Sequence, residues 1–304
     1  ILLGFQNAVI DDTEALLLPG QFCYFYGSGA DIHAQNRTAL EKIADIGKKI
    51  GDELGEFHFT FMILTHYLLN IIFPPVCLAC KNYLKRGEER TRRLCATCSE
   101  KLGYLPGFLC PVCSRRLPAG EKTCHRDSQF ILGAPLRYAA PVARELIHAL
   151  KYGGLKTAAE PLASILAEYL AESIQNSEFA CPAREIENFV FIPIPLHPAK
   201  ERKRGFNQAE VIAESLKRKC GLPIATDALI KTKSAPSQTE KKNREEREEN
   251  VRESFKVKNP ELIAGRNIFL VDDVFTSGAT MREAARILKL AGAKRIIALA
   301  AARA

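Results

Sequence analysis

Residues 267–285 read NIFLVDDVFTSGATMREAA. The apolar run Ile268–Val271 predicts a buried strand of a parallel sheet, and the segment from Ala279 to about Ala291 predicts a helix. Between them stand two adjacent carboxylates and a short loop of small, hydroxyl-bearing residues. Because ligands of open α/β sheets lie at the carboxyl ends of strands, this junction is a candidate binding site.

The loop is predicted to hold a phosphate, because small residues let backbone N–H groups converge and a helix start adds a positive dipole end. The two upstream carboxylates can accept hydrogen bonds from a vicinal diol, so a sugar phosphate meets both demands. The alternative is a plain helix N-cap with solvated aspartates. The candidate site comprises Asp272, Asp273, Thr276, Ser277, Gly278, Ala279 and Thr280.

Residues 134–304 alternate between patterns typical of strands and helices. This alternation, with apolar strands, predicts an α/β fold whose parallel sheet carries helices on both faces. Strands are predicted at 134–139, 188–194, 267–271 and 295–304, with short ones near 227–233 and 253–258, and helices at 141–154, 155–174, 204–221 and 279–291.

Seven of the ten cysteines lie in residues 77–124. The pairs Cys77/Cys80 and Cys95/Cys98 form two C-x2-C knuckles, a spacing typical of a structural zinc ribbon. A redox-active pair is the alternative for any single knuckle, but three such pairs in succession favour metal. Few aliphatic residues surround them, so zinc would replace a hydrophobic core.

A possible second metal set is Cys110, Cys113, Cys124 and His125. A fourth C-x2-C knuckle would need cysteine at position 127, which is Asp127, so His125 or Asp127 would have to complete the set. The alternative is a degenerate, empty site. The spacing does not decide which knuckles share a metal.

The chain of 304 residues carries a net charge of +8, and its basic character suggests polyanionic partners such as phosphates or nucleic acid. Residues 1–61 differ, with four basic and nine acidic side chains, and we interpret them as an unassigned extension, with Met62 as a possible true start. The apolar segment 61–73 is too short to span a bilayer, which predicts a packing helix in a cytoplasmic protein without a membrane span.

The stretch VDDVFTSGAT resembles the loop of type I phosphoribosyltransferases that binds phosphoribosyl pyrophosphate (PRPP). More narrowly, residues 62–304 resemble the ComF family of competence-associated proteins, in which a cysteine-rich ribbon precedes a phosphoribosyltransferase-like domain. The segments that carry the resemblance are FPPVCLAC (73–80), LIHALKYGG (146–154), IPIPLHPAKERKRGFNQAE (192–210), SQTEKKNREEREENVRESF (237–255) and VDDVFTSGAT (271–280). The implied domains are 62–130, a helix plus a single or double zinc ribbon, and 131–304, the phosphoribosyltransferase-like domain.

The resemblance implies roles for the matched positions. Asp272 and Asp273 would hold the ribose hydroxyls, Thr276–Thr280 the 5′-phosphate, and Arg204 with Gly205 the pyrophosphate, with Mg²⁺ bridging the ligand oxygens. The alternative for the basic turn is a solvated loop. A polar segment at 231–250 resembles a flexible lid that would close with Gln238, Lys241, Lys242 and Arg244, or else is an exposed helix.

Two functions remain open at this stage. One is a phosphoribosyltransferase that transfers or senses a phosphoribosyl group; neither its acceptor nor a catalytic residue is assigned. The other is a non-catalytic competence factor that binds single-stranded DNA, works with other competence proteins and keeps a relic PRPP site. Residues 73–130 hold eleven basic and five acidic side chains, which suits a phosphate backbone.

Overall fold

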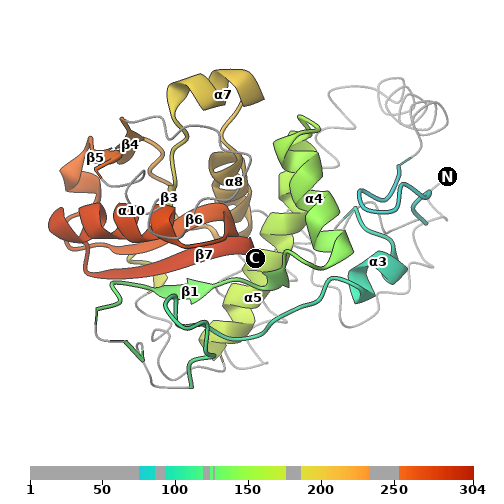
Figure 1. Cartoon of the computed structure of the whole chain (residues 1–304), viewed down its shortest axis with the longest axis horizontal. Helices are drawn as coiled ribbons and strands as arrows, with labels where there is room; N and C mark the ends of the chain where they lie inside the picture. The colour runs from blue at the N-terminus through green and yellow to red at the C-terminus, as the bar shows by residue number, and fades with distance from the viewer. Residues whose placement is uncertain (1–74, 86–92, 119–123, 126, 176–185, 233–252) are drawn as a thin grey trace, which may run out of the picture.

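The computed structural model describes residues 75–85, 93–118, 124–125, 127–175, 186–232 and 253–304 (Figure 1). The predicted extension at 1–61, the segment 61–73 and the four lid residues lie outside these ranges. Among the described residues, no helix has the length and apolar character needed to cross a membrane.

A parallel sheet forms the centre of the molecule, as predicted, in the strand order β1-β7-β6-β3. Strand β6 is central and is the strand that carries the acid pair. Strand β2 also pairs with β7, beyond β1. The strands are β1 Ile131–Gly133, β2 Leu136–Arg137, β3 Phe189–Pro193, β6 Asn267–Phe275 and β7 Arg295–Arg303.

Alternating side chains of β6 point to opposite faces of the sheet, as the period of a strand requires. Phe269 and Val271 belong to the core cluster that includes α4, α5 and α8, whereas Ile268 and Leu270 belong to the cluster that includes α10 and the β4–β5 pair. These flanking elements are α4 Pro141–Lys151, α5 Ala159–Gln175, α8 Gln208–Cys220, α10 Ala279–Leu290, β4 Leu229–Lys231 and β5 Phe255–Val257.

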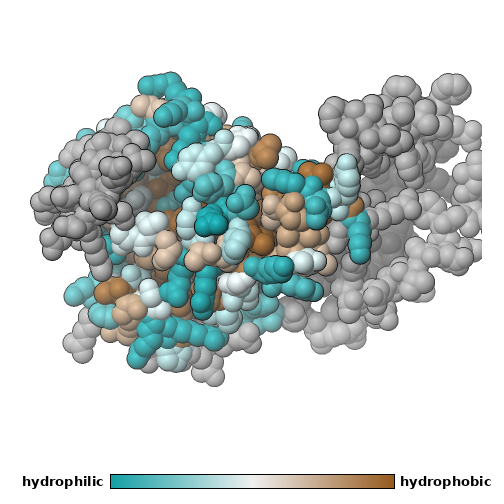
Figure 2. All heavy atoms as spheres, turned by 45° about the vertical axis from the view of Figure 1, so that its right-hand side comes forward, coloured by the Kyte–Doolittle hydropathy of each residue, from teal (hydrophilic) through white to brown (hydrophobic). Residues whose placement is uncertain are grey.

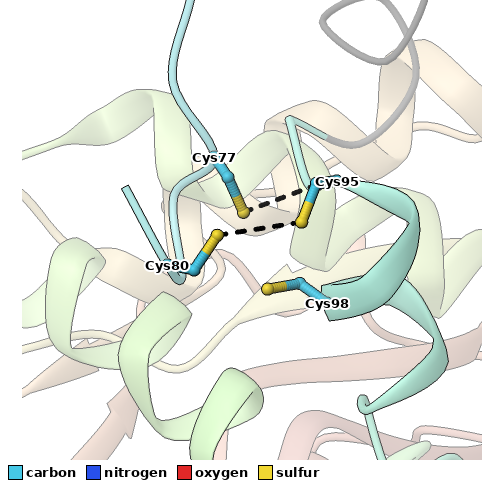
Figure 3. A group of neighbouring side chains, drawn as sticks. All are labelled: Cys77, Cys80, Cys95 and Cys98. Carbon is cyan, nitrogen blue, oxygen red and sulfur yellow. Dashed lines mark hydrogen bonds between the residues drawn. The ribbon is translucent and has the colours of Figure 1, made fainter. Parts of the chain in front are cut away.

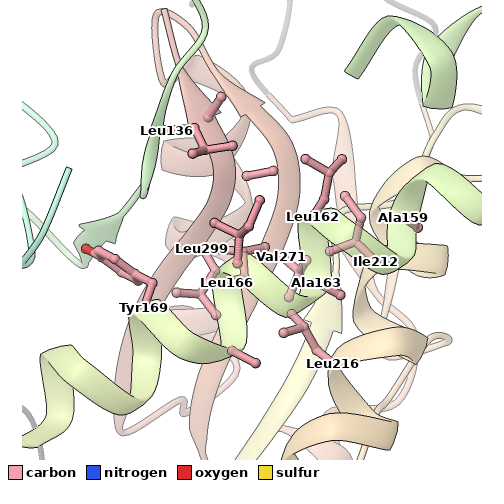
Figure 4. Packing of buried hydrophobic residues seen from close by; sticks show 14 of the residues in the cluster. Leu136, Ala159, Leu162, Ala163, Leu166, Tyr169, Ile212, Leu216, Val271 and Leu299 are labelled. Carbon is pink, nitrogen blue, oxygen red and sulfur yellow. The ribbon is translucent and has the colours of Figure 1, made fainter. Parts of the chain in front are cut away.

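The larger core is built where α5 and α8 cross the sheet (Figure 4). Its labelled leucine, isoleucine and valine side chains are fully buried, so each contributes about 1.5–3 kcal/mol to folding. The residues in contact across this layer include Leu162, Leu166, Ile212, Leu216, Val271 and Leu299.

The local structure differs from the prediction at four places. The single strand predicted at 134–139 is replaced by two short strands, β1 and β2. The strand expected to stop at Val271 continues to Phe275, so the acid pair lies within β6. The helix expected from Arg204 begins at Gln208, because Asn207 caps it through a hydrogen bond from the Ala209 N–H at 3.2 Å. An unpredicted short helix, α7 (Pro198–Arg204), precedes it.

The cysteine-rich segment packs directly on the sheet. Leu109 and Leu132 of β1 exchange two backbone hydrogen bonds of 2.8 and 3.0 Å in an antiparallel pairing. On the neighbouring helix α5, the Tyr169 hydroxyl donates to the Gly107 carbonyl at 2.7 Å. Ribbon residues such as Phe108 belong to the same core cluster as α5, so the two parts share one hydrophobic core.

Candidate sugar-phosphate site and metal centres

The first predicted metal set is brought together by two chain segments (Figure 3). The four sulfur atoms lie within 4.8 Å of one another, and the Sγ atoms of Cys80 and Cys95 are 3.7 Å apart. A tetrahedron with Zn–S bonds of about 2.3 Å has S···S edges of about 3.8 Å. The geometry of Cys77, Cys80, Cys95 and Cys98 therefore fits structural zinc.

The second set also converges, and it answers the question that the spacing left open. Cys113 Sγ lies 3.3 Å from Cys124 Sγ, and His125 Nδ1 lies 3.3 Å from both Cys110 Sγ and Cys124 Sγ. The imidazole thus takes the fourth ligand position, and Asp127 is not in the group. The first four cysteines along the chain therefore form one site, and the next three cysteines form the other with His125.

In each set, the surroundings of the first cysteine along the chain stabilise its thiolate form. Burial raises the pKa of Cys77, but N–H groups of Cys80, Cys95 and Ala79 outweigh burial and bring the pKa down to about 7. Burial also raises the pKa of Cys110, but backbone N–H groups of Cys113 and Val112 outweigh this effect and the pKa falls to about 6. Because zinc binds thiolates, this arrangement favours metal uptake.

The acid pair lies on β6 near the carboxyl edge of the sheet. Asp272 follows Val271, so the two acids take opposite faces of the strand. The Asp273 N–H donates to Asp272 Oδ1 at 2.8 Å, which fixes the first carboxylate. Burial and the adjacent Asp273 charge raise the pKa of Asp272 to about 7. Two acids held this closely require cationic or hydroxyl partners.

Two lysines meet the acid pair from opposite faces of the sheet. Lys151, the last residue of α4, places Nζ 2.9 Å from Asp273 Oδ1. Lys231, the last residue of β4, acts electrostatically on Asp272, and its Nζ lies 5.0 Å from the Phe255 ring centroid. The Lys151 side chain is only 19% exposed, so it is part of the site and not a solvated surface lysine.

The loop after β6 is short and ends in a left-handed glycine. Gly278 has φ 75° and is the N-cap of α10, where it offers no side chain to cap the helix. The Arg282 guanidinium donates to the Ser277 carbonyl at 2.8 Å, and Thr276 is exposed to solvent. The plain N-cap alternative is weak, because the only approach of Ser277 Oγ to the Ala279 N–H is 3.5 Å long.

The basic residues predicted to lie in a turn instead end helix α7, which follows β3 at the same edge of the sheet. Hydrophilic side chains cover the top of the molecule, where α7 lies (Figure 2). Gly205 has φ 82° and terminates the helix, while Arg204 donates to Gln208 Oε1 at 2.9 Å. His197 caps α7, since its Nδ1 accepts a hydrogen bond from the Ala199 N–H at 3.2 Å.

The carboxyl edge therefore combines four features, each from a different element. They are the acid pair of β6, the glycine loop before α10, the basic helix α7 and a lysine from α4. The strand neighbours β3 and β6 hold the first three in register, since the Ile194 N–H donates to the Val271 carbonyl at 2.9 Å. Such an arrangement can bind a polyanion that carries a vicinal diol.

Comparison with known proteins finds two domain families and several similar proteins. The phosphoribosyl transferase domain family matches residues 202–304, and the double zinc ribbon domain family matches residues 68–127. The competence protein ComFC of Bacillus subtilis (strain 168) is 29% identical over 229 residues, covering 70% of this chain and 88% of that protein. The chain is thus similar to a competence protein, and it carries matches to a double zinc ribbon domain and a phosphoribosyl transferase domain.

Two further relatives show how far the similarity extends. The DNA utilization protein YhgH of Escherichia coli O6:H1 is 27% identical over 228 residues, covering 73% of this chain and 94% of YhgH. Competence protein F of Haemophilus influenzae is 24% identical over 229 residues, covering 72% of this chain and 93% of that protein. The similarity thus extends over most of the length of each of these relatives.

Neither Lys231 nor Lys151 is among the site residues that the sequence predicts. Lys231 ends a run, DALIK, whose alternation predicts a strand but says nothing of which sheet edge it approaches. Lys151 stands at the end of an amphipathic helix, before two glycines, where a solvated lysine is common. Only the packing of α4 against the sheet brings its ammonium to Asp273.

Proposed function

We propose that this protein binds PRPP, or a closely related ribose 5-phosphate derivative, at the carboxyl edge of β6. The observation that carries the proposal is the acid pair followed at once by a helix whose N-cap is a left-handed glycine. Because β3 pairs with β6 only as far as Val271, the carboxylates of Asp272 and Asp273 would reach a ribose diol at this edge from the two faces of β6 and accept its hydrogen bonds. The 5′-phosphate would lie on Thr276–Thr280, where N–H groups of the first helical turn lack intrahelical partners.

The leaving group would lie against α7. Arg202, Lys203 and Arg204 end this helix, and burial together with Arg204 lowers the pKa of the nearby Lys200, so positive charge is concentrated there. Cations in this position stabilise a departing pyrophosphate. Bound Mg²⁺ would supply further neutralisation of the phosphoryl charge. A site of this kind could transfer the phosphoribosyl group to an amine or nucleobase nitrogen. It could also bind the same ligand as a sensor, without transferring the group.

A calorimetric titration with PRPP and Mg²⁺ tests the proposal. The wild-type chain is expected to bind, and Asp272→Asn/Asp273→Asn, which keeps the shape of both side chains, is expected to lose about 100-fold in affinity through two charge-assisted hydrogen bonds. Thermal unfolding checks that the variant folds. Absence of wild-type binding, or equal binding by the variant, contradicts the proposal.

A second candidate is a non-catalytic competence factor that binds single-stranded DNA, acts with other competence proteins and keeps a relic PRPP site. Two relatives are named competence proteins, which supports the competence part of this candidate alone. The two candidates are separable. Pyrophosphate release over a panel of amine and nucleobase acceptors would support the transferase, whereas PRPP binding without release would support the sensor. DNA affinity that falls steeply with salt and is weakened when the exposed ribbon residues Lys101 and Arg115 are both replaced by Gln would support the second candidate.

A further inference from the structure

The ion pair between Lys151 and Asp273 lies inside the candidate site, and helix α4 holds the lysine there. The two side chains are 19% and 10% exposed, so solvent and salt screen the pair less than a surface ion pair. Helix α4 is anchored by Leu146, Ile147 and Leu150, which are fully buried. The ammonium therefore reaches Asp273 from a fixed helix end.

This ammonium occupies a position that a ligand needs. Lys151 Nζ is 2.9 Å from Oδ1 of Asp273, a full hydrogen bond to one of the two carboxylate oxygens. A ribose diol would donate its own hydrogen bonds to the same carboxylate. The carboxylate thus has a built-in cation before the ligand arrives, and the incoming hydroxyls make that contact redundant.

The ligand also brings a new partner for the lysine. In PRPP the pyrophosphate is attached to C1′, the carbon next to the one that carries the 2′-hydroxyl, so its oxygens lie close to any carboxylate that holds the diol. A lysine has a flexible four-carbon stem with three rotatable donors, so its ammonium can exchange partners over a short distance while α4 stays in place.

We propose that Lys151 is an exchangeable countercation and a pyrophosphate-binding residue: it neutralises Asp273 in the ligand-free chain and transfers to pyrophosphate oxygens when the diol binds. This inference rests on the proposed function and deepens it. It makes Lys151 a determinant of specificity. Ligands that carry both diol and pyrophosphate gain the lysine contact, whereas ligands without the pyrophosphate only displace it.

Calorimetry with two probes in the presence of Mg²⁺, PRPP and ribose 5-phosphate, tests this inference on the full chain. Lys151→Met is expected to weaken PRPP binding about 10- to 100-fold, the effect of one lost charge-assisted hydrogen bond. It is expected to leave ribose 5-phosphate binding unchanged or stronger, because that ligand no longer competes with the ammonium. The ratio of the two affinities is therefore the decisive quantity.

A matched control is Lys219→Met, which removes another lysine from an ion pair, 2.7 Å from Glu160. Lys219 and Glu160 join α8 to α5, and the control is expected to bind both probes as the wild type does. Since Lys151→Met leaves the buried carboxylate of Asp273 without this partner, thermal unfolding is measured first. If that variant does not fold, Lys151→Gln, which can still donate to Asp273, is the substitute with the same expected loss.

The outcomes separate this inference from the proposed function. A wild-type chain that binds neither probe overturns both. A wild-type chain that binds both probes, with a variant that loses both equally or neither, overturns only the role of Lys151. A selective loss of PRPP in the variant, absent in the Lys219→Met control, supports it.

Discussion

The substitution Gly278→Ala tests how tightly the loop after β6 is packed. A methyl group at this position would lie 2.6 Å from the Phe275 ring and 2.8 Å from the Arg282 guanidinium. The ring is 5% exposed and the guanidinium is held by the Ser277 carbonyl, so neither can move without loss. Overpacking of this kind costs about 1–3 kcal/mol.

The left-handed backbone of Gly278 adds a second cost, which a control can isolate. Gly265 has φ 71°, close to the 75° of Gly278, but a methyl group there would have nothing within 4 Å. Gly265→Ala therefore measures the conformational cost alone, about 1–2 kcal/mol. The difference between the two variants measures the packing cost.

Thermal and chemical unfolding of the two variants provide the assay. Gly278→Ala is expected to unfold about 2 to 12 °C below Gly265→Ala, from the packing cost and the usual dependence of Tm on stability. It is also expected to weaken PRPP binding, whereas Gly265→Ala leaves binding unchanged. Equal stability of the two variants would refute the packing described for this loop.

Three further predictions concern pH, metal and the contact of the ribbon with the sheet. The pKa of Asp272 is about 7 in the folded chain against 3.8 in the unfolded chain, so the folded state holds an extra proton between these pH values. The stability of the wild type should therefore fall relative to that of Asp272→Asn as pH rises from 3.8 to about 7. Denaturation at several pH values checks this. Metal analysis should find two zinc ions per chain and one in Cys110→Ala, and chelation should lower the Tm of the whole chain, since ribbon and sheet share a core; an unchanged Tm would contradict that sharing. Tyr169→Phe should cost about 1–3 kcal/mol in unfolding experiments, because it leaves the Gly107 carbonyl without its donor; no cost would mean that the bond contributes nothing.

Much of this site could be predicted because the information is local. The apolar run before Asp272, the small residues after it and the helix from Ala279 stand in one continuous stretch, so strand, loop and helix follow from period and composition. The first cysteine set is equally local, since a C-x2-C turn aims two thiolates at one point whatever surrounds it.

The parts that could not be predicted depend on packing or on weak patterns. Helix α7 has the sequence PAKERKR, in which every residue is at least partly exposed, so it lacks the apolar periodicity that marks a helix. Strand β1 has only three residues, too few for an alternation to be recognised. The pairing of Lys151 with Asp273 joins residues 122 positions apart, and only the tertiary fold brings them together.

The antiparallel pairing of Leu109 with β1 has a consequence for self-association. A strand at the margin of a sheet presents unpaired N–H and C=O groups, which can recruit another chain and start aggregation. Here the segment between the two knuckle pairs of the ribbon covers that margin. We therefore expect zinc to support solubility as well as folding. Without zinc, the ribbon would no longer cover β1, and another copy of the chain could pair with that exposed edge.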